Sequence, residues 1–372
     1  MSESDTNHGS LSCQTCHGGP SNGAFTGYDD AHEGVVNDPS MSGACEDCHE
    51  EKVASAQNSL HTNLWGYKAA IDKRCGCDYD TGESDGFGLR CAGCHTGCGE
   101  CHISRPNSVG GGFVDGHVIK KTPHMTDQCE ACHGSRIGND YEGMTEGNQM
   151  DIHRFRGKNC IFCHSGQELH GDGLSTNDSG HYEHRYEVES APTCESCHSS
   201  VQDTNNYHNA HWEGWTDVNL QCQVCHSQPY KNCTTCHPNS AGEDEGFTIH
   251  PSVIQLKIGK NTIPDLRDYD YTIVRHIPVH PDSTFIEDMW SPGGLELPNY
   301  DDEPTWKYSS PHNVIRWTEQ CVDSGEGCGS SCHDQSDVYK GYYLREIDLY
   351  DDLEQALPDY DANHSVIIEE FH

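Results

Sequence analysis

The sequence has few basic residues and few hydrophobic ones. Only 22 of its 372 residues are Lys or Arg, against 60 Asp or Glu, so the formal net charge is −38. A surface of this sign repels nucleic acid and anionic membranes, and we expect neither as a partner. Hydrophobic residues make up 33% of the chain, a share that already includes its 23 cysteines. A core made of protein alone would hardly offset the conformational entropy of such a chain.

Long apolar runs are also absent from the sequence. No segment approaches the roughly 20 apolar residues that a membrane-spanning helix requires. The first residues, MSESDTNHGSLSC, carry neither the basic nor the apolar region of a secretory signal. We therefore expect no membrane span, and we find no visible export signal.

Cysteine, by contrast, is abundant and regularly placed. Nine times the chain repeats Cys-x-x-Cys-His. In chain order, motifs 1 to 9 consist of Cys13, Cys16 and His17; Cys45, Cys48 and His49; Cys91, Cys94 and His95; Cys98, Cys101 and His102; Cys129, Cys132 and His133; Cys160, Cys163 and His164; Cys194, Cys197 and His198; Cys222, Cys225 and His226; and Cys233, Cys236 and His237.

This spacing has a chemical reason. Two thiols one helical turn apart can form thioethers with the two vinyl groups of one haem, and the next residue then places an imidazole on the iron. The competing interpretations are a zinc scaffold and a set of disulfides. Neither of them requires a His directly after the second Cys. The repeated motif therefore predicts covalently bound haem c.

A tenth site is predicted by Cys328-Gly-Ser-Ser-Cys332-His333, which has three residues between its cysteines. The alternative for this segment, motif 10, is a disulfide between Cys321 and Cys328. Ten haem sites would leave Cys75, Cys77 and Cys321. Among these, a disulfide between Cys321 and one of the other two is favoured, because a bridge between Cys75 and Cys77 would be strained.

Histidines outside the motifs are candidates for the second axial position of each iron. Of 27 histidines, ten belong to motifs. A second His on each iron favours electron transfer, whereas an open position or a Lys favours catalysis. The first candidates, which lie in segments bordered by Gly, Pro or aromatic residues, are His61, His117, His124, His153, His170, His208, His211, His250, His276 and His312.

The remaining histidines fall into two groups. His8, His32, His181 and His184 are candidates of second rank, while His280, His364 and His372 are expected not to bind iron. His8 lies so near the N-terminus that an arm carrying it could reach a neighbouring subunit. The pair His208 and His211 is spaced for one helical face.

The motif positions predict the organisation of the chain. Residues 1–237 form a nine-haem region, and residues 238–372 form a lobe with distal histidines and the tenth site. Short strands are expected in Val253–Ile258 and Tyr271–Val279, and a short helix is expected from Asn313 to Gln320. The predicted fold class is a multihaem cytochrome c, with mostly irregular chain, short α-helices and a few β-strands wrapped around a stack of haems.

A weaker pattern occurs between motifs 2 and 3. The run Asp78-Tyr-Asp80-Thr-Gly-Glu83-Ser-Asp85-Gly resembles a calcium loop in its alternating oxygen donors. It lacks an acidic residue at the fifth position and a well-placed final Glu. An acidic surface turn is the alternative to a Ca²⁺ site here.

With its motifs laid out, the chain resembles the bacterial and archaeal multihaem c-type cytochromes that carry electrons at or beyond the cell surface. The segments CHGSR (132–136), CQVCHSQPYKNC (222–233) and PTWKYSSPHN (304–313) are similar to the family of octahaem tetrathionate reductase and hydroxylamine oxidoreductase. In that family the active haem has a Lys ligand or a tyrosine crosslink. The present chain has no Cys-x-x-Cys-Lys motif, which speaks against that catalysis.

The resemblance implies a function, a location and partners. We expect an exported, extracellular or cell-surface electron conduit rather than an enzyme, because haem is attached to such motifs after export. Expected partners are other redox proteins, extracellular electron acceptors or further copies of the chain in a head-to-tail filament. The alternative function is a multihaem reductase of nitrogen or sulfur oxyanions.

Overall fold

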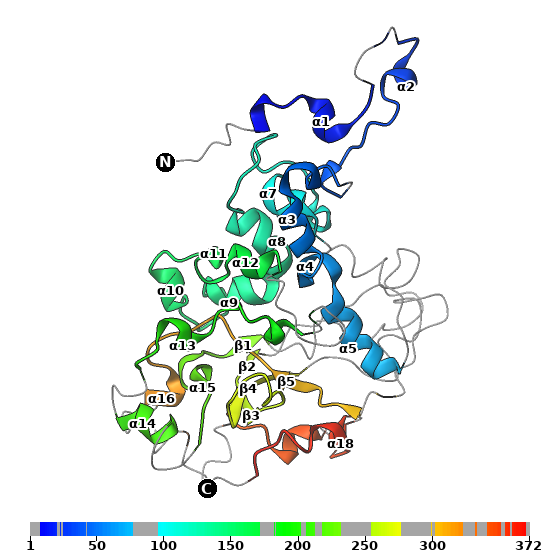
Figure 1. Ribbon diagram of the computed structural model, residues 1–372. Helices are drawn as coiled ribbons and strands as arrows, with labels where there is room; N and C mark the ends of the chain where they lie inside the picture. Colours follow the sequence, from blue (N-terminus) through cyan, green and yellow to red (C-terminus); the bar gives the residue numbers. More distant parts are fainter. Residues whose placement is uncertain are drawn as a thin grey trace. The chain divides into compact units, whose positions relative to one another are not determined.

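The computed structural model describes most of the chain (Figure 1). The described residues are 8–20, 23, 25–41, 43–76, 96–171, 182, 184–201, 206–212, 218–231, 254–276, 299, 302–322, 332, 341–350, 354–357 and 359–369.

Several predictions of the sequence analysis lie outside the described residues. They are motif 3 with Cys91, Cys94 and His95, motif 9 with Cys233, Cys236 and His237, Cys328 and His333 of motif 10, the calcium-like run, Cys77, and His181, His250, His280 and His372.

The chain forms two compact units that interleave along the sequence. Unit 1 consists of residues Met1–Tyr67, Cys91–Gly134 and Asn159–Ala191, and unit 2 of Lys68–Arg90, Ser135–Lys158 and Pro192–His372. The sequence division placed a single boundary after residue 237. The structure instead joins 135–158 to the C-terminal part, for example through a hydrogen bond from the Ile152 amide to the Val314 carbonyl (2.8 Å).

Short helices make up the described part of unit 1. They are α1 (Cys13–His17), α2 (Tyr28–Ala31), α3 (Glu46–Ala56), α4 (Leu60–Asn63), α7 (Cys98–His102), α8 (Glu130–His133), α11 (Cys160–Cys163) and α12 (Gly166–Leu169). Helix α5 (Trp65–Cys75) begins in unit 1 and continues into unit 2. A π-helical turn, Met125–Cys129, leads into α8.

Unit 2 adds two small antiparallel sheets to its short helices. The helices are α9 (Asn139–Tyr141), α10 (Ile152–Phe155), α13 (Cys194–Cys197), α14 (Asn206–Trp212), α15 (Cys222–His226), α16 (Glu319–Val322) and α18 (Tyr360–Asn363). Strand β1 (Tyr230–Lys231) pairs with β2 (Ile254–Gln255). A three-stranded sheet has the order β3 (Lys257–Lys260), β4 (Tyr271–His276), β5 (Trp306–Tyr308).

The structure forms a short helix at every motif that it describes whole. Motifs 1, 2, 4, 5, 6, 7 and 8 coincide with α1, α3, α7, α8, α11, α13 and α15, although Cys45 and Cys129 directly precede their helices and His164 and His198 directly follow theirs. The expected strands are confirmed as well, and in the sheet Ile258 stands opposite Ile273. Asn313–Gln320 differs from expectation, because Val314 forms a β-bridge with Ser227 and helix begins only at Glu319.

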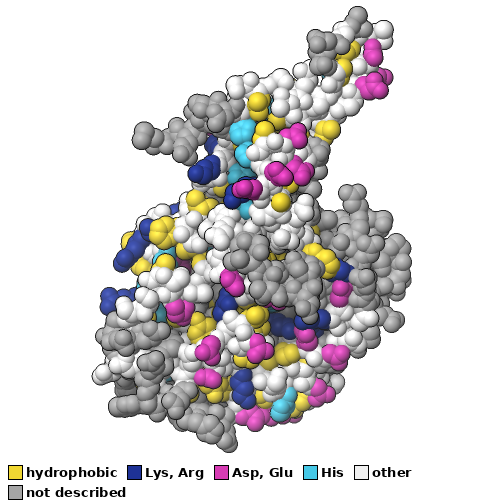
Figure 2. Space-filling view, in the orientation of Figure 1, with side chains coloured by type: hydrophobic (Ala, Val, Ile, Leu, Met, Phe, Trp, Pro, Cys, Tyr) yellow, Lys and Arg dark blue, Asp and Glu magenta, His cyan; other side chains and the backbone are white. Residues whose placement is uncertain are grey.

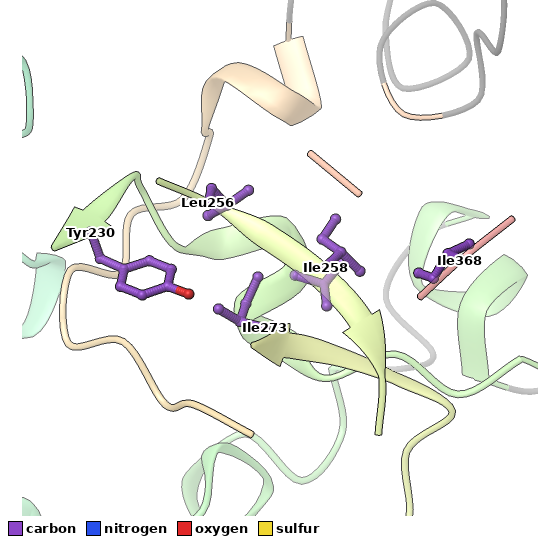
Figure 3. Packing of buried hydrophobic residues seen from close by; sticks show 6 residues of the cluster. Tyr230, Leu256, Ile258, Ile273 and Ile368 are labelled. Carbon is purple, nitrogen blue, oxygen red and sulfur yellow. The ribbon is translucent and has the colours of Figure 1, made fainter. Parts of the chain in front are cut away.

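A hydrophobic core lies around the strands of unit 2. One cluster contains Val224, Tyr230, Leu256, Ile258, Ile273 and Ile368, and Figure 3 shows most of these side chains converging between β1, β3 and β4. A second cluster contains Val274, Trp306, Leu344, Leu349, Val366 and Ile367. Burial of each such side chain stabilises the fold by about 1.5–3 kcal/mol, so protein side chains alone provide a core here.

Unit 1 is different in this respect. Among its described residues, the buried hydrophobic side chains are Leu64, Tyr182 and Val188. Three such residues are too few to order the short helices of this unit. A core made largely of cofactor stays a prediction for unit 1, whereas the described part of unit 2 has a core of protein side chains.

Candidate functional site

Histidines from the motifs meet histidines from outside them. In unit 1, ring centres are separated by 5.9 Å in His49–His8, 6.2 Å in His17–His117, 5.9 Å in His102–His170 and 6.1 Å in His133–His61. In unit 2, the separation is 6.2 Å in His198–His153 and 6.2 Å in His226–His208. Each pair joins one motif His with one His from elsewhere in the chain. Figure 2 shows histidine side chains gathered in a line near α3 and α7.

These separations are those that two axial ligands of one metal ion require. A metal bound to one nitrogen of each ring at about 2 Å, with that nitrogen about 1.1 Å from the ring centre, separates the two centres by about 6.2 Å. Direct contact between aromatic rings covers a wider range, about 4.5–7 Å. The narrow spread of the six separations therefore fits a metal held between two imidazoles.

The second member of each pair lies in or directly beside a short helix or turn. His61 lies in α4, where the Ser59 hydroxyl accepts a hydrogen bond from its amide (3.2 Å). His170 directly follows α12 and precedes Gly171, whose φ is +77°. A Cβ atom on Gly171 would lie 2.5 Å from the Ser55 carbonyl oxygen. Only glycine allows this close approach, which fixes the position of His170.

Hydrogen bonds on Nδ1 orient many of the paired rings and leave Nε2 for a metal. The Nδ1 atoms of four of them lie against backbone carbonyls: His17 with Val36 (2.7 Å), His102 with Lys120 (2.6 Å), His208 with Val201 (2.8 Å) and His226 with Ile315 (3.2 Å). A carbonyl can only accept, so the proton of each neutral ring is on Nδ1. Metal-bound histidines show this arrangement almost without exception.

Two histidines contact carboxylates instead. His153 Nδ1 lies 3.0 Å from Asp151 Oδ1, and His164 Nδ1 lies 3.0 Å from Glu168 Oε1. These hydrogen bonds raise the pKa of both histidines, and burial acts in the opposite direction. The two ring nitrogens are therefore held by a formal negative charge rather than by a neutral carbonyl.

Burial favours the neutral form in other members of the set. Desolvation lowers the pKa of His61 to about 4, and the neighbouring His133 lowers it further. This effect comes from the protein atoms around the ring, because His61 as a whole residue is exposed. Burial likewise lowers the pKa of His133, His170 and His226. Neutral imidazole is the form that binds metals.

The motif cysteines that the structure describes all keep part of their surface accessible. Among the second cysteines of the motifs, Cys48 is exposed, whereas Cys16 and Cys132 are half-buried. A thioether with a haem vinyl group requires a cysteine that the porphyrin can reach. The accessibility of these residues is therefore compatible with covalent attachment of haem.

Cysteines of neighbouring motifs approach one another in unit 1. The thiol of Cys45 in motif 2 is hydrogen-bonded to Cys98 in motif 4, which lowers the pKa of Cys98 to about 7. The thiol of Cys129 in motif 5 is hydrogen-bonded to Cys160 in motif 6, and this raises the pKa of Cys160. His164 also lies close enough to His61 and His133 to lower the pKa of both. Motifs 2 and 4, and motifs 5 and 6, are thus neighbours in space.

Unit 2 repeats this pattern. Cys194 of motif 7 and Cys222 of motif 8 are hydrogen-bonded, which lowers the pKa of Cys194. The Cys321 thiol donates to the Cys225 carbonyl (3.0 Å). Tyr343 is a neighbour of both motif 8 and motif 10. Its hydroxyl donates a hydrogen bond to the Cys332 carbonyl. Burial raises the pKa of Tyr343, and the nearby thiols of Cys332 and Cys225 raise it further.

The other predicted distal ligands have varied surroundings. His276 Nε2, the atom that a distal ligand would present, is hydrogen-bonded to Asp359 Oδ2 (2.7 Å), and its ring packs on Trp306. The prediction that His276 binds iron would require this hydrogen bond to be broken, and it stays a prediction. His211 and His312 direct Nδ1 at the carbonyls of Tyr207 and Ser310 (2.7 and 2.8 Å).

Two further candidates act as helix caps. His124 Nδ1 accepts a hydrogen bond from the Asp127 amide (3.3 Å), and His184 Nδ1 accepts one from the Tyr186 amide (3.2 Å). The second-rank candidate His32 directs Nδ1 at the Tyr28 carbonyl (2.7 Å). His364, expected not to bind, lies beside Tyr360 with ring centres 6.1 Å apart.

The structure places His8 in one of the pairs, and it gives His153 and His164 carboxylate partners that the sequence patterns had not indicated. His8 was a second-rank candidate on an arm that could reach a neighbouring subunit, whereas in the structure its ring faces His49 of the same chain. Asp151 and Glu168 were not singled out. Their spacing carried a signal, because Asp-x-His suits a capping carboxylate and His-x-x-x-Glu suits contact across one helical turn.

Two other kinds of site are absent from the described residues. No described helix combines the length and the apolar character that crossing a membrane requires. The described part of the chain also contains no group of three or more His, Cys, Asp or Glu side chains arranged to hold a metal ion. A pair of facing histidines could supply only two ligands, which is the number that an iron held in a macrocycle can take from protein side chains.

Comparison with known protein families, curated proteins and solved structures finds no match. The motifs and the geometry of this chain are therefore the evidence for its function.

Proposed function

We propose that this protein is a multihaem c-type cytochrome that conducts electrons through closely spaced haems with two histidine ligands each. The observation that carries the proposal is the set of motif histidines facing non-motif histidines at 5.9–6.2 Å. In this proposal the motif cysteines are thioether sulfurs rather than thiols. Haem, when bound, supplies an iron that cycles between two oxidation states.

The spacing of the motifs supports conduction rather than isolated redox sites. Contacts between Cys45 and Cys98, Cys129 and Cys160, and Cys194 and Cys222 would bring the attached porphyrins close together. Because electron tunnelling falls steeply with distance, neighbouring haems of this kind exchange electrons rapidly. The chain's own part is to fix the order of the sites and to exclude water from them.

The shortage of buried side chains in unit 1 supports the same proposal. Haem is a large apolar group, and several haems packed among α3, α7, α8 and α11 would supply the buried surface that the described side chains do not. The acidic surface, with a formal charge of −38, favours solubility and contact with cationic partners or positively charged minerals. We place the protein outside the cytoplasm, with redox proteins, extracellular acceptors or further copies of itself as partners.

The test combines mass, spectrum and one pair of variants. The intact holoprotein is expected to exceed the polypeptide mass by ten haem groups and to have a wholly low-spin spectrum. His61→Gly is expected to convert one iron to the high-spin form, and added imidazole to restore the low-spin spectrum. His364→Gly is the matched control and is expected to leave the spectrum unchanged.

Other outcomes would contradict the proposal in distinct ways. A colourless protein with the bare polypeptide mass would favour a zinc or disulfide scaffold. A high-spin iron in the unmodified protein, with tight cyanide binding, would favour the multihaem reductase. A His61→Gly spectrum identical to that of the unmodified protein would remove His61 from the ligand set.

A further inference from the structure

Two carboxylates distinguish two of the candidate sites from the others. Asp151 and Glu168 contact the Nδ1 atoms of His153 and His164, whereas the other Nδ1 contacts in the described pairs are with backbone carbonyls. His153 faces His198 of motif 7, and His164 belongs to motif 6. One such site therefore lies in each unit.

Asp151 is held rigidly in a protected position. Its side chain is only 3% exposed. Oδ1 accepts from both the amide (2.7 Å) and the ring of His153 (3.0 Å), while Oδ2 accepts from the Val314 amide (2.7 Å). Because so little water reaches it, this negative charge acts on the histidine with little screening.

Glu168 has an equivalent arrangement in α12, four residues after its histidine. Both carboxylate oxygens lie within reach of His164 Nδ1, at 3.0 and 3.1 Å. The side chain is 16% exposed. The Ser165 hydroxyl accepts a hydrogen bond from the Glu168 amide (3.2 Å), which fixes the start of α12.

His124 provides a comparison in which solvent weakens the effect. Its Nδ1 lies 3.0 Å from Asp127 Oδ2, but this nitrogen accepts a hydrogen bond from the Asp127 amide, and the two side chains are 55% and 39% exposed. Water screens a charge in such a position. The two carboxylates on His153 and His164 are therefore the ones expected to influence a bound metal.

We propose that Asp151 and Glu168 are positioning residues that lower the reduction potential of the irons bound by His153 with His198 and by His164. This inference rests on the proposed function. A hydrogen bond from Nδ1–H to a carboxylate gives the imidazole more anionic character and makes it a stronger donor. A stronger donor and a nearby negative charge both stabilise the oxidised iron. The sites of motifs 6 and 7 are thus the hardest to reduce among those whose Nδ1 contacts are described.

The test replaces each carboxylate by its amide in the complete holoprotein. Asp151→Asn and Glu168→Gln keep an acceptor for the ring proton and, at Asp151, a residue that caps helices well. Asp265→Asn removes the same charge from an exposed turn in unit 2 and is the control. The measurements are a spectroelectrochemical titration of all the haems and the low-spin electron paramagnetic resonance spectrum.

Each amide variant is expected to raise the potential of one haem and to alter one low-spin signal, a different one in each variant. The expected rise corresponds to at least a tenfold change in the reduction equilibrium, which for one electron is about 59 mV. The control is expected to move no component by this amount. The inference would be overturned if every haem potential in both amide variants equalled the corresponding potential in the Asp265→Asn control.

The outcome also separates this inference from the proposed function. If the unmodified protein lacks low-spin haem, the proposed function fails before any variant is made. If the haems are present and low-spin but neither amide variant shifts a potential, only the role of Asp151 and Glu168 is rejected. Equal thermal midpoints in all variants would exclude a general change of structure as the cause of a shift.

Discussion

Asp140 carries a buried carboxyl group that lies away from the paired histidines. Asp140 is only 2% exposed. Its Oδ1 atom accepts a hydrogen bond from the Thr145 hydroxyl (3.4 Å). Burial raises the pKa of Asp140 to about 6, although Arg275 acts in the opposite direction. The folded state therefore binds this proton more tightly than the unfolded state does.

The raised pKa has a consequence for stability with a definite sign. The stabilising effect of the protonated carboxyl is complete below the unfolded pKa of about 4 and is lost as the pH rises through about 6. Asp140→Asn is expected to raise the free energy of unfolding at pH 7 by on the order of 2 kcal/mol. It should have little effect at pH 4.

Thermal or guanidinium unfolding of unit 2 between pH 4 and pH 7 measures this difference. The exposed Asp265→Asn variant controls for the change of net charge. A variant that is less stable than the unmodified protein at pH 7 would mean that the attraction between Asp140 and Arg275 outweighs the cost of burying the charge.

Individual residues also show what the sequence could predict about the site. The motif cysteines and histidines follow from a fixed covalent pattern, so they could be assigned without a structure. The distal histidines carry no such pattern. His276 and His153 look alike in sequence, and only the fold places Asp359 on the Nε2 atom of one and Asp151 on the Nδ1 atom of the other.

Among the elements, those with local signals were predictable and those fixed by partners far away in the sequence were not. Motif helices such as α13 are fixed within a few residues, since the Thr193 hydroxyl accepts from the Ser196 amide (3.2 Å). The run Asn313–Ile315 was expected to be helical. It is extended because Ile315 forms two hydrogen bonds with His226, about ninety residues earlier in the chain. The Ile315 amide donates to the His226 carbonyl (2.9 Å), and the Ile315 carbonyl accepts from His226 Nδ1 (3.2 Å).

This extended segment links two sites of unit 2. The Val314 amide holds Asp151, and the Ile315 carbonyl holds His226. Asn313 is completely buried and anchors the segment. Its Nδ2 donates to the carbonyls of Gln228 (2.9 Å) and Pro229 (3.0 Å), and its Oδ1 accepts from the Gln228 amide (3.3 Å).

Asn313→Ala is expected to lower the free energy of unfolding by about 2–4 kcal/mol, because it leaves buried backbone groups without partners. It should also alter the low-spin signals of the sites at motifs 7 and 8, which share the segment. Chemical unfolding and electron paramagnetic resonance measure the two effects. Asn209→Ala, at an exposed position of α14, is the control. Lost stability with every low-spin signal unchanged would contradict the link between the segment and the sites.

At the scale of the whole molecule, the two units depend on different kinds of interior. Unit 2 has two hydrophobic clusters around β3, β4 and β5, and the register between β3 and β4 is fixed by hydrogen-bonded strands. Unit 1 has few buried hydrophobic side chains among its described residues. We therefore expect the two units to respond differently to the loss of haem.

The chain produced without haem attachment tests this difference by hydrogen exchange. Amides in Lys257–Lys260 and Tyr271–His276 are expected to stay protected, because the strands pair and pack on protein side chains. Amides in α7 and α8 are expected to exchange as in an unfolded chain, since a helix of a few residues is unstable without packing. The holoprotein is the control, and both regions should be protected in it. Protection of α7 and α8 without haem would mean that unit 1 folds on protein contacts alone, and a cofactor would then not be needed to explain its interior.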